Sequence, residues 1–160
     1  MHTAFLGLGS NIDPQANIRS AMAALQNSFE RVAFSPAYQC PAVGFEGDDF
    51  LNLVARIDTG LKPLELRHHL FELENRHDRD RSAPRWSDRS LDVDILLYDD
   101  LYLLSPLLEI PRKEILNTAH VLKPLADLAP DLLHPTELIT MSELWARFPQ
   151  SQTTLNPFVW

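Results

Sequence analysis

The alternation of hydrophobic and polar residues is most regular between residues 91 and 96, where Leu, Val and Ile alternate with Asp, Asp and Leu. A period of two is typical of a β-strand. Because successive side chains of a strand point to opposite faces, we expect the carboxylates of Asp92 and Asp94 on one face and the apolar side chains on the other. The two carboxylates would then lie about 7 Å apart along the strand.

Apolar runs and helical spacings predict the remaining elements. Strands are expected at residues 3–8, 32–40 and 50–59, and Pro36 should interrupt the second of them. Apolar residues at helical spacing predict helices that begin near Pro14, Pro63, His120 and Thr140. Asp13 is expected to cap the first helix, and Thr140 with Glu143 forms a capping box for the last.

The order of these elements predicts the fold. Strand, helix, strand, strand, helix and strand follow one another, which is the order of a ferredoxin-like fold. We therefore expect an α+β protein with an antiparallel sheet, helices on one face and extra helices at the C-terminus. No repeat, low-complexity segment or linker divides the sequence, so residues 1–160 are predicted to form a single domain.

The charge and the cysteine content narrow the class of protein. The formal net charge is −8, whereas a general nucleic-acid binder is normally basic. The single cysteine, Cys40, excludes an internal disulfide and fits a reducing compartment. The sequence shows no signal peptide and no apolar run long enough to span a membrane. We expect a cytoplasmic protein that binds neither nucleic acid nor membranes.

Basic residues gather just before the two carboxylates. Five of the fourteen lie there: Arg76, Arg79, Arg81, Arg85 and Arg89. Two carboxylates on one face of a strand can hold one hard cation jointly or two cations side by side. Arginines beside them suggest Mg²⁺ together with a polyphosphate. The alternative is a solvated surface of ion pairs, because an Asp-x-Asp motif alone is nearly uninformative.

Two further polar features allow a structural or a binding role. Residues 7–11, Gly-Leu-Gly-Ser-Asn, could cradle an anion, although the P-loop and Rossmann spacings are absent. A strand-to-helix turn that needs small residues is the favoured interpretation. Asn52 interrupts an apolar run, so its amide needs a partner, which is either a structural hydrogen bond or a ligand.

Taken in order, several motifs of this chain resemble those of the 6-hydroxymethyl-7,8-dihydropterin pyrophosphokinases of folate biosynthesis. They are Gly9-Ser10-Asn11, residues 38–44, Phe50-Leu51-Asn52, Glu74, Arg85-Trp86-x-x-Arg89-Ser90-Leu91-Asp92-x-Asp94, Val121-Leu122-x-Pro124-Leu125 and Leu128-Ala129-Pro130. The resemblance covers nearly the whole chain, and the ordered set is far more specific than any of its parts. It implies an enzyme that transfers the β,γ-pyrophosphoryl group of ATP to the pterin hydroxymethyl oxygen and leaves AMP.

The resemblance also implies which residues bind ATP and metal. Asp92 and Asp94 would hold two Mg²⁺ ions, which orient the triphosphate of the co-substrate ATP and offset charge at the β-phosphorus. Arg79 and Arg81 match a loop that closes over the site and contacts phosphate, so they join the two aspartates as catalytic candidates. The implied ATP-binding residues are Glu74, Arg81, Arg89, Ile95 and Arg112.

The pterin site implied by the resemblance combines aromatic faces with an amide. Trp86 would cover the ring, and Asn52 would bind its donor–acceptor edge together with backbone groups of residues 41–43. The implied pterin-binding residues are Cys40, Pro41, Val43, Phe50, Asn52, Trp86 and His120. Cys40 needs no reactive role there. We expect a monomer that acts on small molecules alone.

The chain departs from the family pattern at several positions. Asp88 and Ser90 stand where proline and threonine are common, and Arg112, Thr118 and His120 stand where histidine, arginine and phenylalanine are usual. The missing arginine removes part of the expected triphosphate site, although Arg112 could restore the charge. The departures leave open a relative that binds a pterin or nucleotide without catalysis. An RNA-recognition module is disfavoured by the acidic charge.

Overall fold

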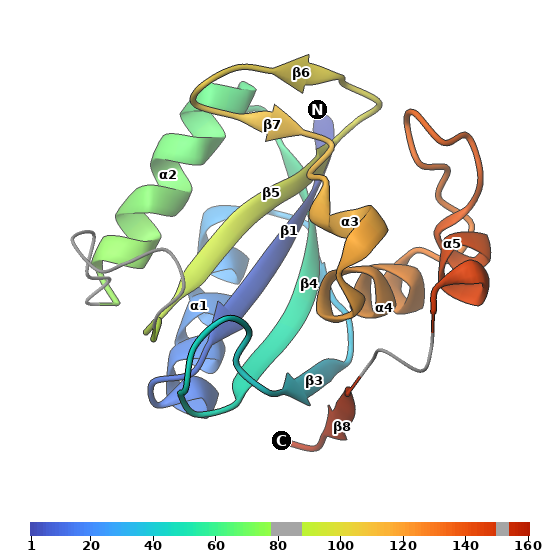
Figure 1. Cartoon of the computed structure of the whole chain (residues 1–160). Coiled ribbons are helices and arrows are strands. Elements are labelled where there is room, and N and C mark those ends of the chain that lie inside the picture. The colour runs from blue at the N-terminus through green and yellow to red at the C-terminus, as the bar shows by residue number, and fades with distance from the viewer. Residues whose placement is uncertain (78–87, 150–153) are drawn as a thin grey trace.

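The computed structural model describes residues 1–77, 88–149 and 154–160, and within them it shows a six-stranded antiparallel sheet (Figure 1). The strand order is β5-β1-β4-β3-β8, and β2 pairs with β4 beside β3. The strands are β1 (His2–Ser10), β2 (Val32–Phe34), β3 (Ala37–Cys40), β4 (Phe50–Thr59), β5 (Asp92–Tyr98) and β8 (Asn156–Phe158). The order β5-β1-β4-β3 is that of the predicted ferredoxin-like fold.

Five helices and a small hairpin complete the described part of the chain. The helices are α1 (Pro14–Ser28), α2 (Pro63–Asn75), α3 (Glu114–Asn117), α4 (Ala119–Leu128) and α5 (Met141–Arg147). The hairpin pairs β6 (Leu103–Leu104) with β7 (Glu109–Ile110). None of the helices among the described residues is both long and apolar enough to cross a membrane.

The helix ends agree with the sequence in part. Thr140 accepts a hydrogen bond on its hydroxyl from the Glu143 backbone N–H at 3.1 Å, so the predicted cap of α5 is confirmed. Asp13 is the N-cap residue of α1, as predicted, but its side chain makes no capping hydrogen bond, because its backbone lies in the left-handed region (φ 41°). Its backbone carbonyl instead accepts from the Asn17 N–H at 3.0 Å.

Helices α1 and α2 cover one face of the sheet (Figure 1). The core on this face joins inward-facing residues of the central strands, including Leu6, Leu53 and Val93, to Leu25 of α1 and Leu70 of α2. Each of these side chains is at least 95% shielded from solvent. The apolar side of β5 therefore faces the helices, as its alternating sequence predicts.

The C-terminal helices pack on the opposite face of the sheet. There, Phe5 of β1 and Leu96 of β5 join a second apolar cluster with Ile115 of α3, Leu122 of α4 and Met141 of α5. The extra C-terminal helices expected from the sequence thus form a third layer beside the sheet. Because Asp92 and Asp94 alternate with core residues Val93 and Ile95, their side chains share this second face with Leu96.

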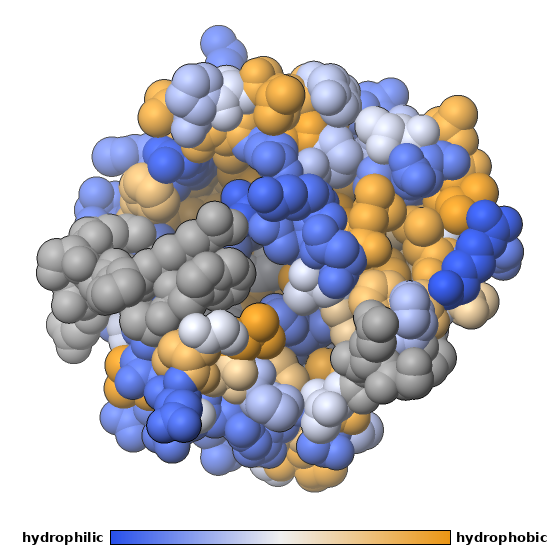
Figure 2. All heavy atoms as spheres, viewed as in Figure 1, coloured by the Kyte–Doolittle hydropathy of each residue, from blue (hydrophilic) through white to orange (hydrophobic). Residues whose placement is uncertain are grey.

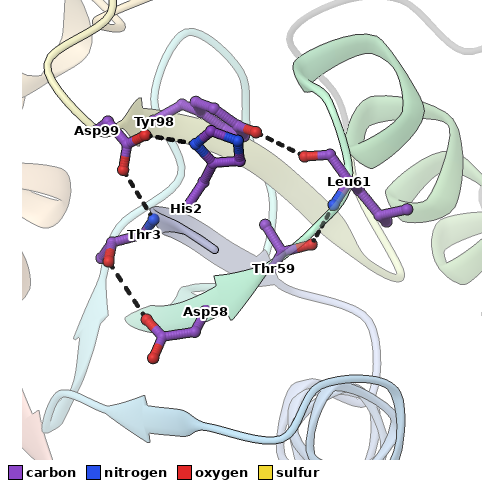
Figure 3. Close-up of polar contacts among 7 residues, drawn as sticks. All are labelled: His2, Thr3, Asp58, Thr59, Leu61, Tyr98 and Asp99. Carbon is purple, nitrogen blue, oxygen red and sulfur yellow. Dashed lines mark hydrogen bonds and ion pairs between the residues drawn. The ribbon is translucent and has the colours of Figure 1, made fainter.

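A cluster of hydrogen bonds closes the sheet at the end opposite the two aspartates (Figure 3). The Asp99 carboxylate accepts from the Thr3 backbone N–H at 2.8 Å and lies 2.7 Å from His2 Nδ1. The Tyr98 hydroxyl donates to the Leu61 carbonyl at 2.6 Å. These bonds link β1, β5 and the loop before α2, so they fix the strands far from the acidic side chains.

Candidate functional site

The two aspartates lie in a row with polar groups of the neighbouring strands. Asp92 is paired with Gly9 and Asp94 with Gly7 in the antiparallel ladder between β5 and β1. On the other side of β1, Gly9 is paired with Asn52 of β4. Asn52 and Asp92 therefore lie two strands apart, a separation of roughly 10 Å. This places a neutral amide and a carboxylate on either side of a strand position that has no side chain.

Gly9 is required by the close approach of Asn52. A Cβ atom on Gly9 would lie 2.9 Å from Asn52 Oδ1, which is shorter than real Cβ contacts. The interpretation that residues 7–11 need small side chains is thus supported at Gly9, but the strand continues to Ser10 instead of turning there. The absence of a side chain on Gly9 makes room for the amide oxygen on the second face of the sheet.

The Asn52 amide also has the structural partner that the sequence left open. Its Nδ2 lies 3.1 Å from the sulfur of Cys40, to which it donates a hydrogen bond. Burial raises the pKa of the Cys40 thiol to about 11, so the thiol stays protonated at neutral pH. The structure therefore gives Cys40 a role in orienting the amide, with Asn52 Oδ1 directed over Gly9.

Negative charge gathers around Asp94. Burial and the neighbouring Asp92 carboxylate raise the pKa of Asp94 to about 7, although Arg112 opposes the shift. Glu74 and Glu114 add to the negative potential. A cation bound between the two aspartates would relieve this repulsion. The carboxylate oxygens are also the ligand type that Mg²⁺ prefers, so the residues present fit that ion.

The protein supplies few ligands besides this pair. Within residues 1–77, 88–149 and 154–160, no group of three or more His, Cys, Asp or Glu side chains is placed to hold a metal ion. Apart from these described residues, water or oxygen atoms of a substrate could complete the coordination of a cation at Asp92 and Asp94. Magnesium sites built on one or two carboxylates and substrate phosphates have this composition.

A cavity of about 280 Å³ opens next to Asp94. Residues of α2, β5, the β6–β7 hairpin and the segment that follows it line its walls. They are Arg67, Leu70, Phe71, Val93, Asp94, Ile95, Ser105, Pro106, Leu107, Leu108, Glu109 and Arg112. Figure 2 shows this side of the molecule hollowed beside hydrophilic residues that lie over α3. Three predicted site residues, Asp94, Ile95 and Arg112, therefore meet at one cavity.

Arg112 supplies positive charge at this cavity. Burial disfavours its charged form, but Asp94 and the nearby glutamates outweigh this effect and raise the pKa of Arg112. Its Nε lies 3.3 Å from an oxygen of Glu114, and its backbone N–H donates to the Leu96 carbonyl at 3.0 Å. The guanidinium is thus held beside the acidic residues, where it can contact an anionic group that a metal ion also binds.

Glu74, a predicted ATP-binding residue, lies near the end of α2 beside the start of β5. Its side chain is buried, and Oε2 accepts a hydrogen bond from the Val93 backbone N–H at 2.9 Å. Glu74 is not among the residues that line the cavity. Its carboxylate fixes the start of β5 against α2, so it acts on the neighbouring aspartates through their strand.

Arg89 lies at the entrance to β5 and is held by Asn11. The Arg89 backbone N–H donates to Asn11 Oδ1 at 2.7 Å, and the Asn11 N–H donates to the Arg89 carbonyl at 3.0 Å. Asn11 Nδ2 also donates to the Asp88 carboxylate at 2.7 Å. The carboxylate of Asp88, one of the departures from the family pattern, therefore has a structural partner. Arg79, Arg81 and Trp86 lie outside the described residues.

The predicted pterin residues fall on two sides of Asn52. On one side, Cys40 ends β3, and the exposed Val43 belongs to the loop that follows Pro41. Phe50, at the start of β4, meets Phe45 of this loop edge-on, with 6.3 Å between ring centroids. These residues form one wall beside the Asn52 amide.

The opposite wall is the start of α4, where His120 lies. Burial lowers the pKa of His120, although the Asp92 and Glu114 carboxylates oppose the shift, so its imidazole is neutral at pH 7. A hydrogen bond from the Tyr38 hydroxyl to the Asp127 carboxylate joins β3 to α4, and Lys123 lies 2.8 Å from the same carboxylate. This contact ties the two walls together.

Sequence reasoning missed three residues of this region. Asn11 was part of a motif for which a strand-to-helix turn was the favoured interpretation, yet its amide binds both Asp88 and the backbone of Arg89 just before β5. Arg67 and Glu109 line the cavity, but they come from a helix and a hairpin that are distant in the sequence. Their joint position depends on how α2 and β7 pack beside β5.

The fold and the site together define a class of α+β protein with an acidic site beside a cavity. The family model described as 7,8-dihydro-6-hydroxymethylpterin-pyrophosphokinase (HPPK) matches residues 5–130, and the chain belongs to this family. The comparisons thereby confirm the family that the ordered motifs resemble.

Bacterial proteins of similar sequence are named as pyrophosphokinases of this family. A 2-amino-4-hydroxy-6-hydroxymethyldihydropteridine pyrophosphokinase from Haemophilus influenzae is 35% identical over 162 residues, covering 98% of this chain and all of the relative. The protein of the same name from Pseudomonas aeruginosa is 41% identical over 135 residues, covering 82% of this chain and 83% of the relative.

Solved structures share the fold at much lower identity. Wild-type HPPK-DHPS of Plasmodium falciparum matches with a TM-score of 0.68 at 14% identity, covering 91% of this chain. The chain spans 44% of the length of that protein. A second HPPK-DHPS structure, solved in complex with substrates, matches with a TM-score of 0.69 at 13% identity and 43% coverage of its chain. These matches support the ferredoxin-like assignment of the sheet and helices.

Proposed function

We propose that this protein transfers the β,γ-pyrophosphoryl group of ATP to the hydroxymethyl oxygen of 6-hydroxymethyl-7,8-dihydropterin, releasing AMP. The observation that carries the proposal is the row formed by Asn52, Gly9 and Asp92. It places an amide suited to a pterin edge about 10 Å from carboxylates suited to Mg²⁺ and phosphate. Family membership then selects this reaction among those that an acidic site could support.

Asp92 and Asp94 would hold two Mg²⁺ ions, which would supply positive charge to the phosphate oxygens during the transfer. The aspartates are placed for this by the paired strands, because β1 and Glu74 fix β5 on both sides. Preorganised ligands need little rearrangement when the substrate arrives. The acidic pair thus costs folding stability in the empty protein and favours binding of the cation.

The nucleotide would occupy the cavity between α2, β5 and the β6–β7 hairpin. Its phosphates would lie at the end where Asp94 and Arg112 meet, since both line the cavity. Arg89 would contact phosphate from the entrance to β5, and Arg79 and Arg81 would contribute from the segment before it. Ile95 would pack against the nucleotide from the strand. The cavity has enough volume for a bound part of a nucleotide and opens beside the acidic pair.

The pterin would lie over Gly9, between the loop after β3 and the start of α4. Asn52 Oδ1 would accept from its amino edge, while Cys40 holds the other end of the amide. Backbone groups of residues 41–43 would complete this edge, and Phe50, His120 and Trp86 would contact the ring. The hydroxymethyl oxygen would then face the carboxylates across the row and attack the β-phosphorus in line.

A relative that binds pterin or nucleotide without catalysis is the second candidate function. Thr118 carries no charge where the family pattern has arginine, and its hydroxyl donates to the neighbouring Asn117 side chain at 2.7 Å. Against this candidate, an acidic pair that served no cation would only destabilise the fold. Arg112, which faces Asp94, supplies a positive charge near the missing one.

Measuring AMP release from ATP and Mg²⁺, with and without the pterin, separates these functions. Pterin-dependent AMP, together with the pyrophosphorylated pterin in equal amount, supports the transferase. Tight pterin binding by calorimetry without AMP supports the non-catalytic relative. If neither binding nor turnover occurs, both proposals fail. Omitting Mg²⁺ and adding EDTA in parallel tests the metal requirement, and sedimentation of the same sample tests the expected monomer.

A further inference from the structure

Two side chains on α2 form a stacked pair on the wall of the cavity. The Arg67 guanidinium carbon lies 4.0 Å from the centroid of the Phe71 ring. The residues are four apart in the helix, so they share one side of it, and both line the cavity next to Asp94. The cavity wall therefore carries a planar cation supported by an aromatic ring.

The guanidinium keeps its charge available to a ligand. Among residues 1–77, 88–149 and 154–160, no carboxylate forms an ion pair with Arg67, although Arg112 of the same cavity is paired with Glu114. The phenyl ring restricts the guanidinium without neutralising it. An arginine held in this way can offer its other face to a second flat group.

The position of Arg67 along α2 separates it from the acidic pair. Glu74, near the C-terminal end of the helix, binds the backbone of Val93 beside the two aspartates. Arg67 lies seven residues earlier, about 10 Å along the helix axis. It also borders the cavity together with residues of the β6–β7 hairpin, such as Leu107. Phosphates held at Asp94 would therefore leave the base of the nucleotide nearer to Arg67.

We propose that Arg67, stacked on Phe71, is the platform on which the nucleobase of ATP stacks. The inference rests on the proposed function, which places the nucleotide in this cavity. Bases stack on guanidinium planes as well as on aromatic rings. The contact would stabilise the bound base through planar stacking, so both the shape and the charge of the side chain matter.

The test compares two ligands in calorimetric titrations of the full protein with Mg²⁺ present. One is α,β-methylene ATP, which resists cleavage to AMP, and the other is inorganic tripolyphosphate, which lacks the base. Arg67→Ala should weaken binding of the nucleotide about 5- to 100-fold and leave tripolyphosphate binding within about twofold of wild type. Arg67→Lys keeps the charge but not the plane, so it should restore little of the loss.

Arg19→Ala provides the matched control. Arg19 lies over the Trp160 ring at 5.2 Å, so this variant loses a contact of the same kind at a site that does not border the cavity. It should bind both ligands as wild type does. Thermal denaturation of each variant shows whether it is folded under the conditions of the titration.

Three outcomes overturn the platform. If Arg67→Ala weakens the binding of both ligands equally, the side chain contacts phosphate. If Arg67→Lys binds the nucleotide as wild type does, charge alone is sufficient. The third outcome is an Arg67→Ala variant that binds the nucleotide as tightly as wild type. The failure of the proposed function is distinct, because the wild-type protein itself would then bind no nucleotide with Mg²⁺. The platform is supported if Arg67→Ala weakens binding of the nucleotide but not of tripolyphosphate, and if Arg67→Lys does not restore that binding.

Discussion

Replacing Asp94 with asparagine should make the metal-free protein more stable at alkaline pH. The substitution keeps the shape of the side chain and removes a carboxylate whose pKa is raised to about 7 by burial and by Asp92. A carboxyl group with a raised pKa in the folded state destabilises that state once it must ionise. The effect begins above the unfolded pKa near 4 and is complete above pH 7.

The size of the effect follows from the shift. A difference of about three pKa units corresponds to a ceiling of roughly 4 kcal/mol at pH 8, at about 1.4 kcal/mol per unit. Because the side chain of Asp94 is half-buried, we expect about 2 kcal/mol. At pH 5 only about one unit separates the pH from the unfolded pKa, so the expected gain falls to about 1 kcal/mol or less.

Urea denaturation in EDTA measures this prediction. The midpoints of wild type and Asp94→Asn at pH 5 and pH 8 give the difference in unfolding free energy at each pH. Adding Mg²⁺ should stabilise wild type and leave the variant nearly unchanged, because the variant lacks one carboxylate ligand. A variant that is less stable than wild type at pH 8, or a difference that does not change with pH, would refute the conclusion that ionised Asp94 destabilises the folded protein.

Three further substitutions test other parts of the structure. Gly9→Ala should raise the pterin KM about tenfold or more, because its Cβ would lie 2.9 Å from Asn52 Oδ1. An unchanged KM in steady-state assays would contradict the placement of the pterin over this strand. Tyr38→Phe should raise the pterin KM more than Tyr98→Phe, although each loses one hydroxyl hydrogen bond, since only the first joins the two walls of the site; equal kinetic effects would argue against this link. Asp99→Ala should lower the unfolding free energy by about 1 kcal/mol at pH 7, allowing for its exposure. Partial burial opposes the shift, but hydrogen bonds from the N-terminal strand lower the pKa of Asp99, so the loss should shrink as the pH falls below 4; a loss that stays constant down to pH 3 in urea titrations would disprove this.

The sequence predicts the sheet because the hydrophobic pattern of each strand reflects which of its side chains are buried. The alternation around Asp92 and Asp94 is enough to predict their common face, since side-chain direction in a strand depends only on parity. The break at Pro36 is likewise local, because proline cannot donate to the ladder, and the structure places it between β2 and β3. These predictions required no knowledge of the remaining chain.

The missed features depend on contacts between distant segments. Strand β8 has three residues and contains Pro157, so no local pattern predicts it. It forms because the edge of β3 is available for pairing. The partner of Asn52 is Cys40 on the neighbouring strand, which only the register of β3 and β4 brings into reach. The side chain of Asp13 makes no capping hydrogen bond because the backbone turns into the left-handed region before α1. Tertiary packing, and not local propensity, determines this pairing, this hydrogen bond and this backbone conformation.

The candidate site likewise combines features that the sequence predicts with features that only the packing of distant segments produces. Residue types in Asp92-x-Asp94 predict a cation site, and family motifs order the remaining candidates. The cavity wall that contains Arg67 requires α2 and the β6–β7 hairpin to meet beside β5, which no spacing in the sequence encodes. The burial of Glu74 against Val93 is likewise a consequence of packing between a helix and a strand.

The central claim is that Asp92 and Asp94 bind the cation required for pterin-dependent cleavage of ATP. Its most direct test is the rate of AMP release with ATP, Mg²⁺ and pterin for wild type and Asp94→Ala, with circular dichroism to show that the variant is folded. We predict that the folded variant loses at least about 10³-fold in turnover, the scale of a lost electrostatic contribution at the reacting phosphate. Turnover in the variant near that of wild type would contradict the claim.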